Sequence, residues 1–399
     1  MLFATILTPS FILRFLLSIS LVFMLIGHNL FDKKVLFLNF IVLLYFNLKY
    51  SKKLYLRMIN NIPLCLVLAW CLLSVTWSSW VFISFEEVLV QILLFLTCLM
   101  FVNTFSTQII FKIFKSSAVF VIAINFLALI FLGNSAFSDA GMVGIYSHKN
   151  SFGLIMAICI FVLLYDYLRE PSKLVFCFFF LGAILLILSM SKTSISLFLI
   201  ITIFTHTIKK IDFKFKTNFV YTVSSFLFFS ILIFSILIIV YKNEILEYLY
   251  YNIDLEFMTG RGNLWLTMLL HAGDNLTYGF GFNSVWGKGE FSEIYFTELY
   301  ESNPLWVESL AASDGGYIDL LISLGIVGFS LFLFYILNTI LLLLVVKKSP
   351  NFPIMFSLFL FVVIHNFTET TFLLSTNILW FIAIMISFMA YSETRTVYN

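Results

Sequence analysis

The sequence predicts an all-α polytopic membrane protein with about 12 transmembrane helices and one large outer loop that contains amphipathic helices. Two observations predict this fold class. Of the 399 residues, 61% are hydrophobic and only 11% are charged, whereas a soluble domain carries about 25% charged residues. The apolar residues also occur in long runs that are apolar on every face, as helices in lipid require. Strands of a membrane barrel would alternate apolar and polar residues instead, so a barrel is not expected.

Charge and cysteine content exclude several other classes of protein. The formal net charge is +2, which is too small to indicate nucleic acid or another polyanion as a partner. The five cysteines all lie inside apolar runs and none forms a Cys-x-x-Cys pair: Cys65, Cys71, Cys98, Cys159 and Cys177. Buried cysteine behaves as a small apolar residue, so neither a disulfide scaffold nor a cysteine metal site is expected.

The apolar runs divide the chain into three parts. We expect spans at residues 8–29, 35–48, 62–79, 87–103, 116–133, 152–168, 174–189, 193–207, 218–241, 316–346, 352–371 and 374–391. The first run is longer than a signal-peptide core and lacks a small-residue cleavage pattern, so it reads as a span. The prediction is therefore a bundle of about nine helices over 1–241 and a large loop over 242–315. A second bundle of about three helices follows over 316–399, with a short cytoplasmic C-terminus.

The distribution of Lys and Arg predicts the orientation, because these residues are retained in cytoplasmic loops. One alternating set of loops holds fifteen of them and the other set holds seven, while Arg14 lies within a span. The seven are Lys33, Lys34, Lys149, Lys192, Lys242, Arg261 and Lys288. This bias places both termini inside and the 242–315 loop outside. Lys33 and Lys34 run against it, so the first hairpin is the least constrained part of the topology.

We call residues 242–315 the cap. Ten of the 21 acidic residues lie in it between Glu244 and Glu308, with Asp314 as an eleventh, together with Trp265, Trp286 and Trp306. We expect a small amphipathic unit on the outer membrane face, with aromatic side chains at the interface. Acidic and aromatic side chains are also what sugars need, since carboxylates pair with hydroxyls and ring faces stack on sugar rings. The alternative is a solvated connector between two bundles.

Three cations stand at the outer ends of predicted helices: Lys149, Lys192 and Arg261. A charge at bilayer depth costs at least about 2.5 kcal/mol, so it usually has a partner or a task. A convergent set of outward cations suits an anionic headgroup, and pyrophosphate is the strongest candidate, since Arg grips phosphate bidentately and Lys adds a point charge. The alternative is that each cation snorkels to lipid phosphate or pairs with a loop carboxylate.

Other polar residues fall in or beside predicted spans, namely Asp314, Asp319, His365 and Glu369. Asp314 precedes Gly315 and Gly316, a flexible turn that a substrate could approach closely. Asp314 could equally cap the following helix, which Asp favours at this position.

Metal and cofactor sites are not expected. The five histidines lack ligand spacing, and Asp254 and Glu256 match a metal-binding acidic pair only over two residues. No nucleotide-binding fingerprint occurs.

Five segments, taken in order, resemble the O-antigen polymerase/O-antigen ligase superfamily, closest to its polysaccharide polymerase branch. They are Ser74-Val75-Thr76-Trp77-Ser78; His148-Lys149-Asn150 with Gly153; Ser189-Met190-Ser191-Lys192-Thr193; Gly260-Arg261 with Leu264-Trp265 and Gly279-Phe280-Gly281; and Tyr317-Ile318-Asp319-Leu320-Leu321 with Leu324-Gly325 and Gly328. Together they cover roughly residues 73–330. A fainter match follows at Asn366-Phe367-Thr368-Glu369.

The resemblance implies a helical membrane enzyme similar to GT-C-type glycosyltransferases. It would sit in the bacterial inner membrane with its active site on the periplasmic side, and it would need no cofactor. It would transfer a growing chain from undecaprenyl pyrophosphate onto the next lipid-linked repeat unit, as in O-antigen, lipopolysaccharide or exopolysaccharide biosynthesis. The implied partners are lipid-linked oligosaccharide repeat units, the lipid bilayer and a chain-length regulator membrane protein, with no nucleic acid.

The resemblance also assigns roles to residues. Arg261 would hold the pyrophosphate and stabilise the charge that develops on leaving, with help from Lys149 and Lys192. Asp314 would orient or deprotonate the acceptor hydroxyl, with Glu308 in reserve. The other substrate-binding candidates are His148, Trp265 and Tyr317.

Two departures from the family pattern bear on the alternatives. Ligases of this superfamily carry a His-Asn or similar pair three residues before the tyrosine, where this chain has Asp314 and Gly315. That difference favours a polymerase over a ligase or a related oligosaccharyltransferase. Lys192 stands where Arg is usual, which keeps the charge but loses the bidentate geometry. A polytopic transporter or flippase would instead predict paired charges deep in the bundle, and an inactive structural subunit would leave the outward cations unexplained.

Overall fold

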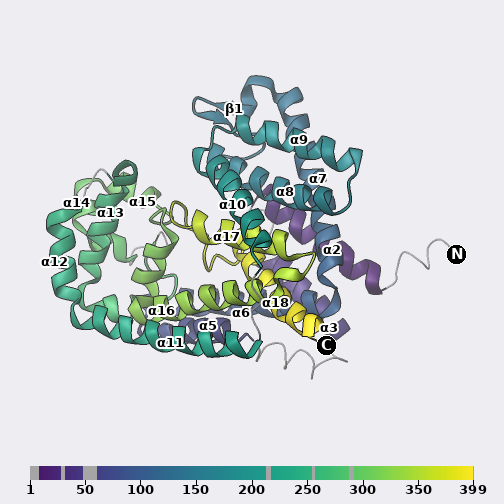
Figure 1. Cartoon of the computed structure of the whole chain (residues 1–399). Coiled ribbons are helices and arrows are strands. Elements are labelled where there is room, and N and C mark those ends of the chain that lie inside the picture. Colours follow the sequence, from purple (N-terminus) through teal and green to yellow (C-terminus); the bar gives the residue numbers. More distant parts are fainter. Residues whose placement is uncertain are drawn as a thin grey trace.

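The computed structural model describes residues 9–27, 32–47, 61–212, 217–253, 257–286 and 292–398, and these residues form an all-α protein (Figure 1). The helices are α2 (Pro9–Ile26), α3 (Lys33–Asn47), α5 (Ile62–Ser74), α6 (Val81–Thr104), α7 (Thr107–Leu132), α8 (Lys149–Arg169), α9 (Lys173–Leu188), α10 (Lys192–Lys210), α11 (Thr217–Val240), α12 (Lys242–Asn252), α13 (Phe257–Ala272), α14 (Glu298–Ser302), α15 (Pro304–Ser309), α16 (Gly316–Val345), α17 (Phe352–His365) and α18 (Ile378–Tyr398). The one sheet in these residues is a hairpin of β1 (Phe137–Ser138) and β2 (Gly141–Met142).

Each span predicted from the sequence overlaps a helix. The spans predicted at 352–371 and 374–391 were wrong at their facing ends, because α17 ends at His365 and α18 begins at Ile378, with a loop between them. Within the described residues, five helices are long and apolar enough to cross a membrane: Val81–Thr104, Thr107–Ala136, Lys149–Arg169, Thr222–Val240 and Gly316–Lys348. Five shorter apolar helices accompany them: Phe11–Ile26, Ile62–Trp77, Lys173–Leu188, Phe352–His365 and Ile378–Thr394. The all-α class and the membrane-embedded character are therefore confirmed, whereas the number of crossings stays a prediction.

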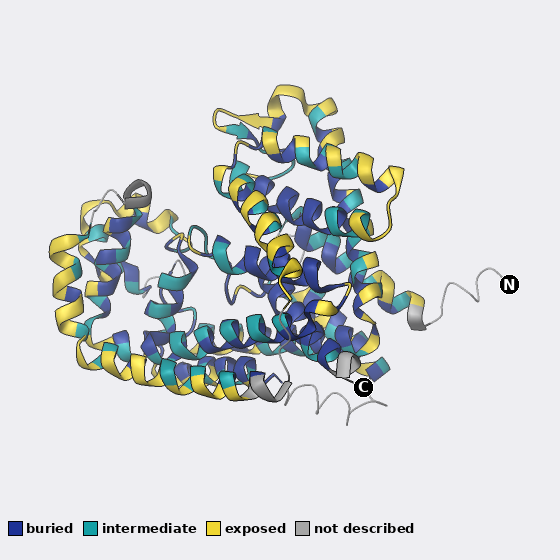
Figure 2. Cartoon of the chain, viewed as in Figure 1, coloured by how far each residue is buried: buried dark blue, intermediate teal, exposed yellow. Residues whose placement is uncertain are grey.

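Burial separates the inner helices from the outer ones (Figure 2). Residues 152–163 of α8 are all buried, so this helix is enclosed by its neighbours on every face. In α11, by contrast, most of the apolar surface stays exposed, including Phe226, Phe229 and Phe234. A helix that is apolar all round but exposed on one side has the composition of a helix that faces lipid.

Polar side chains join helices inside the apolar bundle. Asn338 of α16 accepts a hydrogen bond from the Ser224 hydroxyl of α11 at 2.7 Å and donates one to the Tyr391 hydroxyl of α18 at 2.8 Å. Gln91 of α6 accepts a hydrogen bond from the Trp380 indole of α18 at 2.9 Å. Such bonds, each worth about 0.6 kcal/mol in membrane proteins, fix the register of helices that have little hydrophobic force between them.

The cap contains α12, α13, α14 and α15 and packs around its own apolar cluster. Leu264, Met268 and Leu269 of α13 contribute to this cluster, and so do Ile322 and Ile326 of α16. In Figure 1 the four cap helices lie at the left, beside α16 and the end of α11. The cap therefore packs against the N-terminal third of α16.

A break in α16 joins the cap to the bundle. Gly325 has φ 68° and ψ −178°, so the carbonyl groups just before it lose their partners within the helix. The segment after α13 supplies new donors: the Phe280 amide bonds the Ile322 carbonyl at 3.0 Å, and the Gly281 amide bonds the Ser323 carbonyl at 2.9 Å. The Trp70 indole of α5 bonds the Leu324 carbonyl at 2.9 Å. The Gly279-Phe280-Gly281 motif thus pairs its backbone with a broken helix.

Candidate functional site

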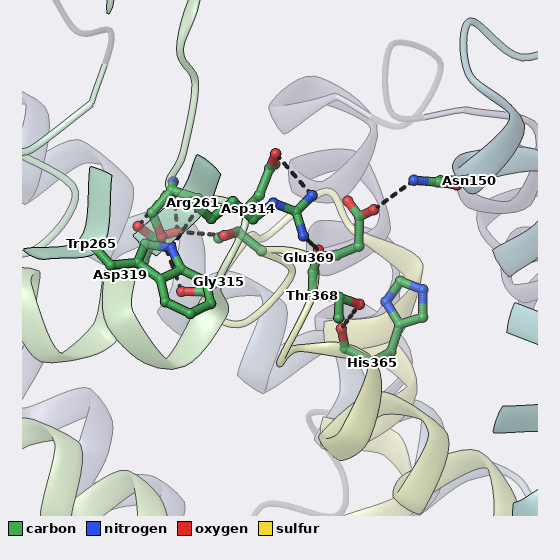
Figure 3. Close-up of polar contacts among 11 residues, drawn as sticks. Asn150, Arg261, Trp265, Asp314, Gly315, Asp319, His365, Thr368 and Glu369 are labelled. Atoms are coloured by element: carbon green, nitrogen blue, oxygen red, sulfur yellow. Dashed lines mark hydrogen bonds and ion pairs between the residues drawn. The ribbon is translucent and has the colours of Figure 1, made fainter. Parts of the chain in front are cut away.

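Arg261 stands near the start of α13 and links three segments (Figure 3). Its Nη1 donates a hydrogen bond to the Thr368 carbonyl oxygen at 2.9 Å, in the loop between α17 and α18. Its Nη2 lies 3.2 Å from Oδ2 of Asp314, just before α16. The Arg261 side chain is 23% exposed and that of Asp314 is 56% exposed, so the pair lies at the surface of the fold and is open on the Asp314 side.

The backbone holds Asp314 in an uncommon conformation. Its φ is +53°, in the left-handed region that non-glycine residues seldom adopt. The neighbouring turn is fixed by Trp265, whose indole donates to the Ser313 carbonyl at 2.9 Å and whose ring occupies the space where a Cβ on Gly315 would lie. Trp265 and Arg261 are four residues apart on α13, so they share one face of that helix. The structure therefore uses Trp265 to seat the Asp314 turn against Arg261.

The start of α16 is tied to the α17–α18 loop. The Gly316 amide bonds the Asn366 carbonyl at 2.9 Å, and a side chain on Gly316 would collide with the Asn366 amide group. Asp319 is buried and accepts hydrogen bonds from the Ser313 amide and the Thr370 hydroxyl. These bonds fix the loop that carries Thr368, so Asp319 acts here as a structural anchor.

Glu369 extends the polar cluster toward α8. Its Oε1 accepts a hydrogen bond from Asn150 Nδ2 at 3.2 Å, which brings the His-Lys-Asn segment to the same place (Figure 3). Burial, reinforced by the nearby Asp314 carboxylate, raises the pKa of Glu369 above its usual range, while the Arg261 charge opposes the rise. A carboxyl group with a raised pKa binds a proton more tightly than usual, which suits it to accept one.

A cavity of about 550 Å³ opens beside Glu369 and Asn150. It is lined partly by polar side chains from the α8 start and the α17–α18 loop, and partly by apolar ones from α2 and α8. His365 also lines it; the side chain is 1% exposed, and its Nδ1 has no hydrogen-bond partner among the described residues. A buried polar atom that faces a cavity without a partner is costly, so a ligand or water is its natural complement.

The two predicted lysines lie at the same end of the bundle but apart from Arg261. The Lys149 ammonium donates to the Ala140 carbonyl of the β-hairpin at 3.1 Å, and Lys192 is exposed at the first position of α10. Ser191 packs so closely on Gly153 that a Cβ atom on residue 153 would collide with the Ser191 side chain. The starts of α8 and α10 therefore lie side by side. Within the part of the chain described, no ion pair joins either lysine to the Arg261 cluster.

The remaining predicted site residues, His148, Tyr317 and Glu308, lie in different surroundings. His148 is exposed next to Lys149, whereas Tyr317 is half-buried with its hydroxyl bonded to the Val363 carbonyl at 2.9 Å. Glu308 is exposed in α15 and accepts a hydrogen bond from the Tyr300 hydroxyl at 3.1 Å, so its described partner is within the cap. The acidic pair at positions 254 and 256 lies outside the described residues.

Three residues of the cluster were not among the predicted site residues: Asn150, His365 and Glu369. Each carried a usable signal. Asn150 belongs to the His-Lys-Asn segment, while His365 and Glu369 are ionisable groups beside a span, where such residues are expensive. What the sequence lacked was the pairing of positions 150 and 369, which are distant in the chain.

The comparisons with known proteins leave the family of this chain undefined. No protein-family model matches it, and no curated protein matches it. What the fold and the cluster define is a class: a helical membrane protein with an arginine, two carboxylates and a polar cavity gathered beside one large cap. The particular activity therefore rests on the chemistry of that cluster.

Proposed function

We propose that the chain is a bacterial O-antigen or polysaccharide polymerase of the inner membrane. It would extend lipid-linked chains on the periplasmic side, where the cap lies. The observation that carries the proposal is the position of Arg261, which is held between the Asp314 carboxylate and the carbonyl of Thr368, the residue before the cavity-lining Glu369. The finer topology, about 12 spans with the cap outside, is part of the same proposal.

The proposed reaction breaks the bond between the anomeric carbon of the donor chain and its pyrophosphate. The acceptor hydroxyl of the next repeat unit forms the new glycosidic bond and gives up its proton to a carboxylate, and undecaprenyl pyrophosphate leaves. Negative charge grows on the pyrophosphate as it departs, and a preorganised guanidinium stabilises that charge. The energy is stored in the donor, so no nucleotide is needed.

Two carboxylates are available for the proton, and their surroundings differ. Asp314 pairs directly with Arg261, so its charge helps to hold the guanidinium in place. Glu369 is more enclosed, lines the cavity and has a raised pKa. We assign proton acceptance to Glu369 and the positioning of Arg261 to Asp314, which narrows the role predicted for Asp314 from the sequence.

Purified protein with lipid-linked repeat unit as the only sugar substrate tests the proposal. A ladder of polymer on a gel that is lost in Arg261→Ala supports a polymerase. Product that forms only when lipid A–core is added would favour a ligase instead. Movement of the lipid-linked unit across a vesicle membrane without any new glycosidic bond would favour a flippase.

A further inference from the structure

A second cavity, of about 540 Å³, lies between the cap and the α5–α6 turn. It is separate from the cavity beside Glu369, with which it shares no lining residue. Gly279 and Phe280 line it together with residues that bear aromatic, hydroxyl, amide or acidic groups: Trp70, Trp77, Ser79, Asn275, Tyr278 and Glu293.

Three aromatic rings form one wall of this cavity. The ring centroids of Trp70 and Trp77 are 5.5 Å apart, and that of Tyr278 lies 6.3 Å from Trp70 and 6.2 Å from Trp77. The two tryptophan indoles are anchored by hydrogen bonds to backbone carbonyls, Trp70 to Leu324 and Trp77 to Gly279. Tyr278 is 56% exposed, so the wall is accessible from solvent. Anchored rings offer a rigid apolar surface that loses little entropy when it binds a ligand.

A carboxylate forms a polar part of the lining. The Glu293 side chain is only 12% exposed. One of its oxygens accepts a hydrogen bond from the Ser79 hydroxyl, and the other lies 3.3 Å from Nε2 of His271. Asn275 adds amide donors and an acceptor. The cavity therefore combines a flat apolar wall with oriented acceptors and donors.

We propose that this cavity is a glycan subsite that binds a sugar ring of the growing chain. The inference rests on the proposed function for the identity of the glycan. A sugar ring presents an apolar C–H face and an edge of hydroxyl groups, which match the aromatic wall and the Glu293–Asn275 edge. Helix α13 spans the two sites: Arg261 and His271 are ten residues apart, which is about 15 Å along the helix. The subsite thus lies several sugar units away from Arg261, the residue proposed to bind the pyrophosphate.

The other reading of the aromatic wall is an interfacial belt, since Trp and Tyr gather at the membrane–water boundary. A belt requires ring bodies near the lipid headgroups, but it does not require a largely buried carboxylate in the lining of the same cavity. The two readings differ in what Glu293 does, because only a subsite needs its oxygens for ligand binding.

Binding is tested with full-length protein in detergent and with fragments of the source cell's own surface polysaccharide, released by partial acid hydrolysis. Calorimetry measures the affinity of the wild type, Tyr278→Ala and Glu293→Gln. Each variant should weaken binding about 10-fold or more, because one loses a stacking surface and the other a charged acceptor. Trp306→Ala is the matched control, since Trp306 is an exposed cap aromatic outside the cavity, and its affinity should be unchanged.

Wild-type affinity in both cavity variants, or no binding to the wild type, would overturn the subsite and assign the rings to an interfacial belt. The thermal midpoints of all variants are measured in parallel; Tyr278 is exposed and Glu293→Gln keeps the side-chain shape, so neither should unfold. The two proposals fail separately. Fragment binding without any polymerisation would overturn the polymerase alone, whereas polymerisation with unaltered fragment affinity in the variants would overturn the subsite alone.

Discussion

At the scale of single residues, the guanidinium of Arg261 is the group that the described contacts favour most strongly. It makes one hydrogen bond to a backbone carbonyl and one ion pair to a carboxylate, and these two partners come from different segments. An arginine held in this way is preorganised for a bidentate anion.

Replacement of Arg261 should therefore separate charge from geometry. Arg261→Ala should lower the rate of polymer formation by at least about 10²-fold, because a preorganised donor to the leaving group is lost. The rate of Arg261→Lys should lie between those of Arg261→Ala and the wild type, since the positive charge remains while the bidentate geometry of the guanidinium is lost. The rate is measured from the gel ladder. Arg169→Ala, which removes an arginine bonded to Asn351 at the C-terminal end of α8, is the control and should polymerise normally. Equal activity in Arg261→Ala and the control would refute the assignment.

The pH dependence of activity should report Glu369. Its pKa is raised in the folded protein, so activity that needs the carboxylate is lost as the pH falls through that raised value. Glu369→Gln should lower the rate by about 10²-fold or more and remove this acidic limb from the profile. The free energy of unfolding should depend on pH in the opposite direction. The folded state binds the Glu369 proton more tightly than the unfolded state does. The stabilisation from this protonation is therefore complete below the pKa that Glu369 has in the unfolded chain and is lost as pH rises through its pKa in the folded protein. An acidic limb that persists in Glu369→Gln would point to another group.

Asp314→Asn distinguishes positioning from proton transfer. The amide keeps the shape of the turn but removes the negative charge opposite Arg261. We expect a higher KM for the lipid-linked donor with a smaller change in kcat, because the guanidinium loses the partner that orients it. A pH profile with the wild-type acidic limb should remain. Loss of kcat with an unchanged KM would instead make Asp314 the proton acceptor.

At the scale of elements, the break in α16 is the feature that joins the cap to the bundle. The sequence analysis noted Gly325 as part of the Leu324-Gly325 pair but did not predict the break, because an apolar run with one glycine is still expected to form a continuous helix. Only the approach of the 279–281 backbone shows why the helix opens there, because the free carbonyls need donors that are remote in sequence. Composition and run length were sufficient to place the long apolar helices, since those properties are local, but not the cap helices α12 to α15 or the loop between α17 and α18.

Gly325→Ala should be destabilising for two reasons. A side chain at φ 68° is strained by about 1–2 kcal/mol, and the added Cβ would collide with the backbone of residues 277–279. Gly133→Ala is the matched control, because Gly133 has φ 52° with open space around its Cβ and so tests strain alone. The midpoint of thermal unfolding in detergent should fall more for Gly325→Ala than for Gly133→Ala. Equal shifts would show that the close approach contributes nothing.

At the scale of the whole molecule, five helices long enough to span and five shorter apolar ones are arranged so that α8 is enclosed and α11 is exposed. Lengths and apolar runs predicted the apolar helices in outline, since a bilayer sets both, but not which of them would be enclosed or exposed. The gathering of the cluster was not predictable in the same way. It joins positions in α8, α13 and the α17–α18 loop, and only long-range packing brings these together.

The predicted orientation can be tested by cysteine labelling in intact cells. Ser302→Cys in the exposed part of the cap should react with a membrane-impermeant thiol reagent, because the cap is expected to face outward. Lys209→Cys at the end of α10 should react only after the membrane is permeabilised. The natural cysteines are first replaced by serine or alanine, since Cys177 is exposed. Labelling of Lys209→Cys in intact cells would reverse the topology.

The hydrogen bonds between the 279–281 segment and the broken α16 have an evolutionary consequence. Outer loops of membrane enzymes are natural units for recombination, because a new loop can bring a new specificity to an old bundle. Here the loop completes the backbone bonding of a helix that belongs to the bundle. A productive chimera would therefore have to inherit residues 322–325 together with its loop, and the crossover point would fall beyond the break rather than at the membrane surface.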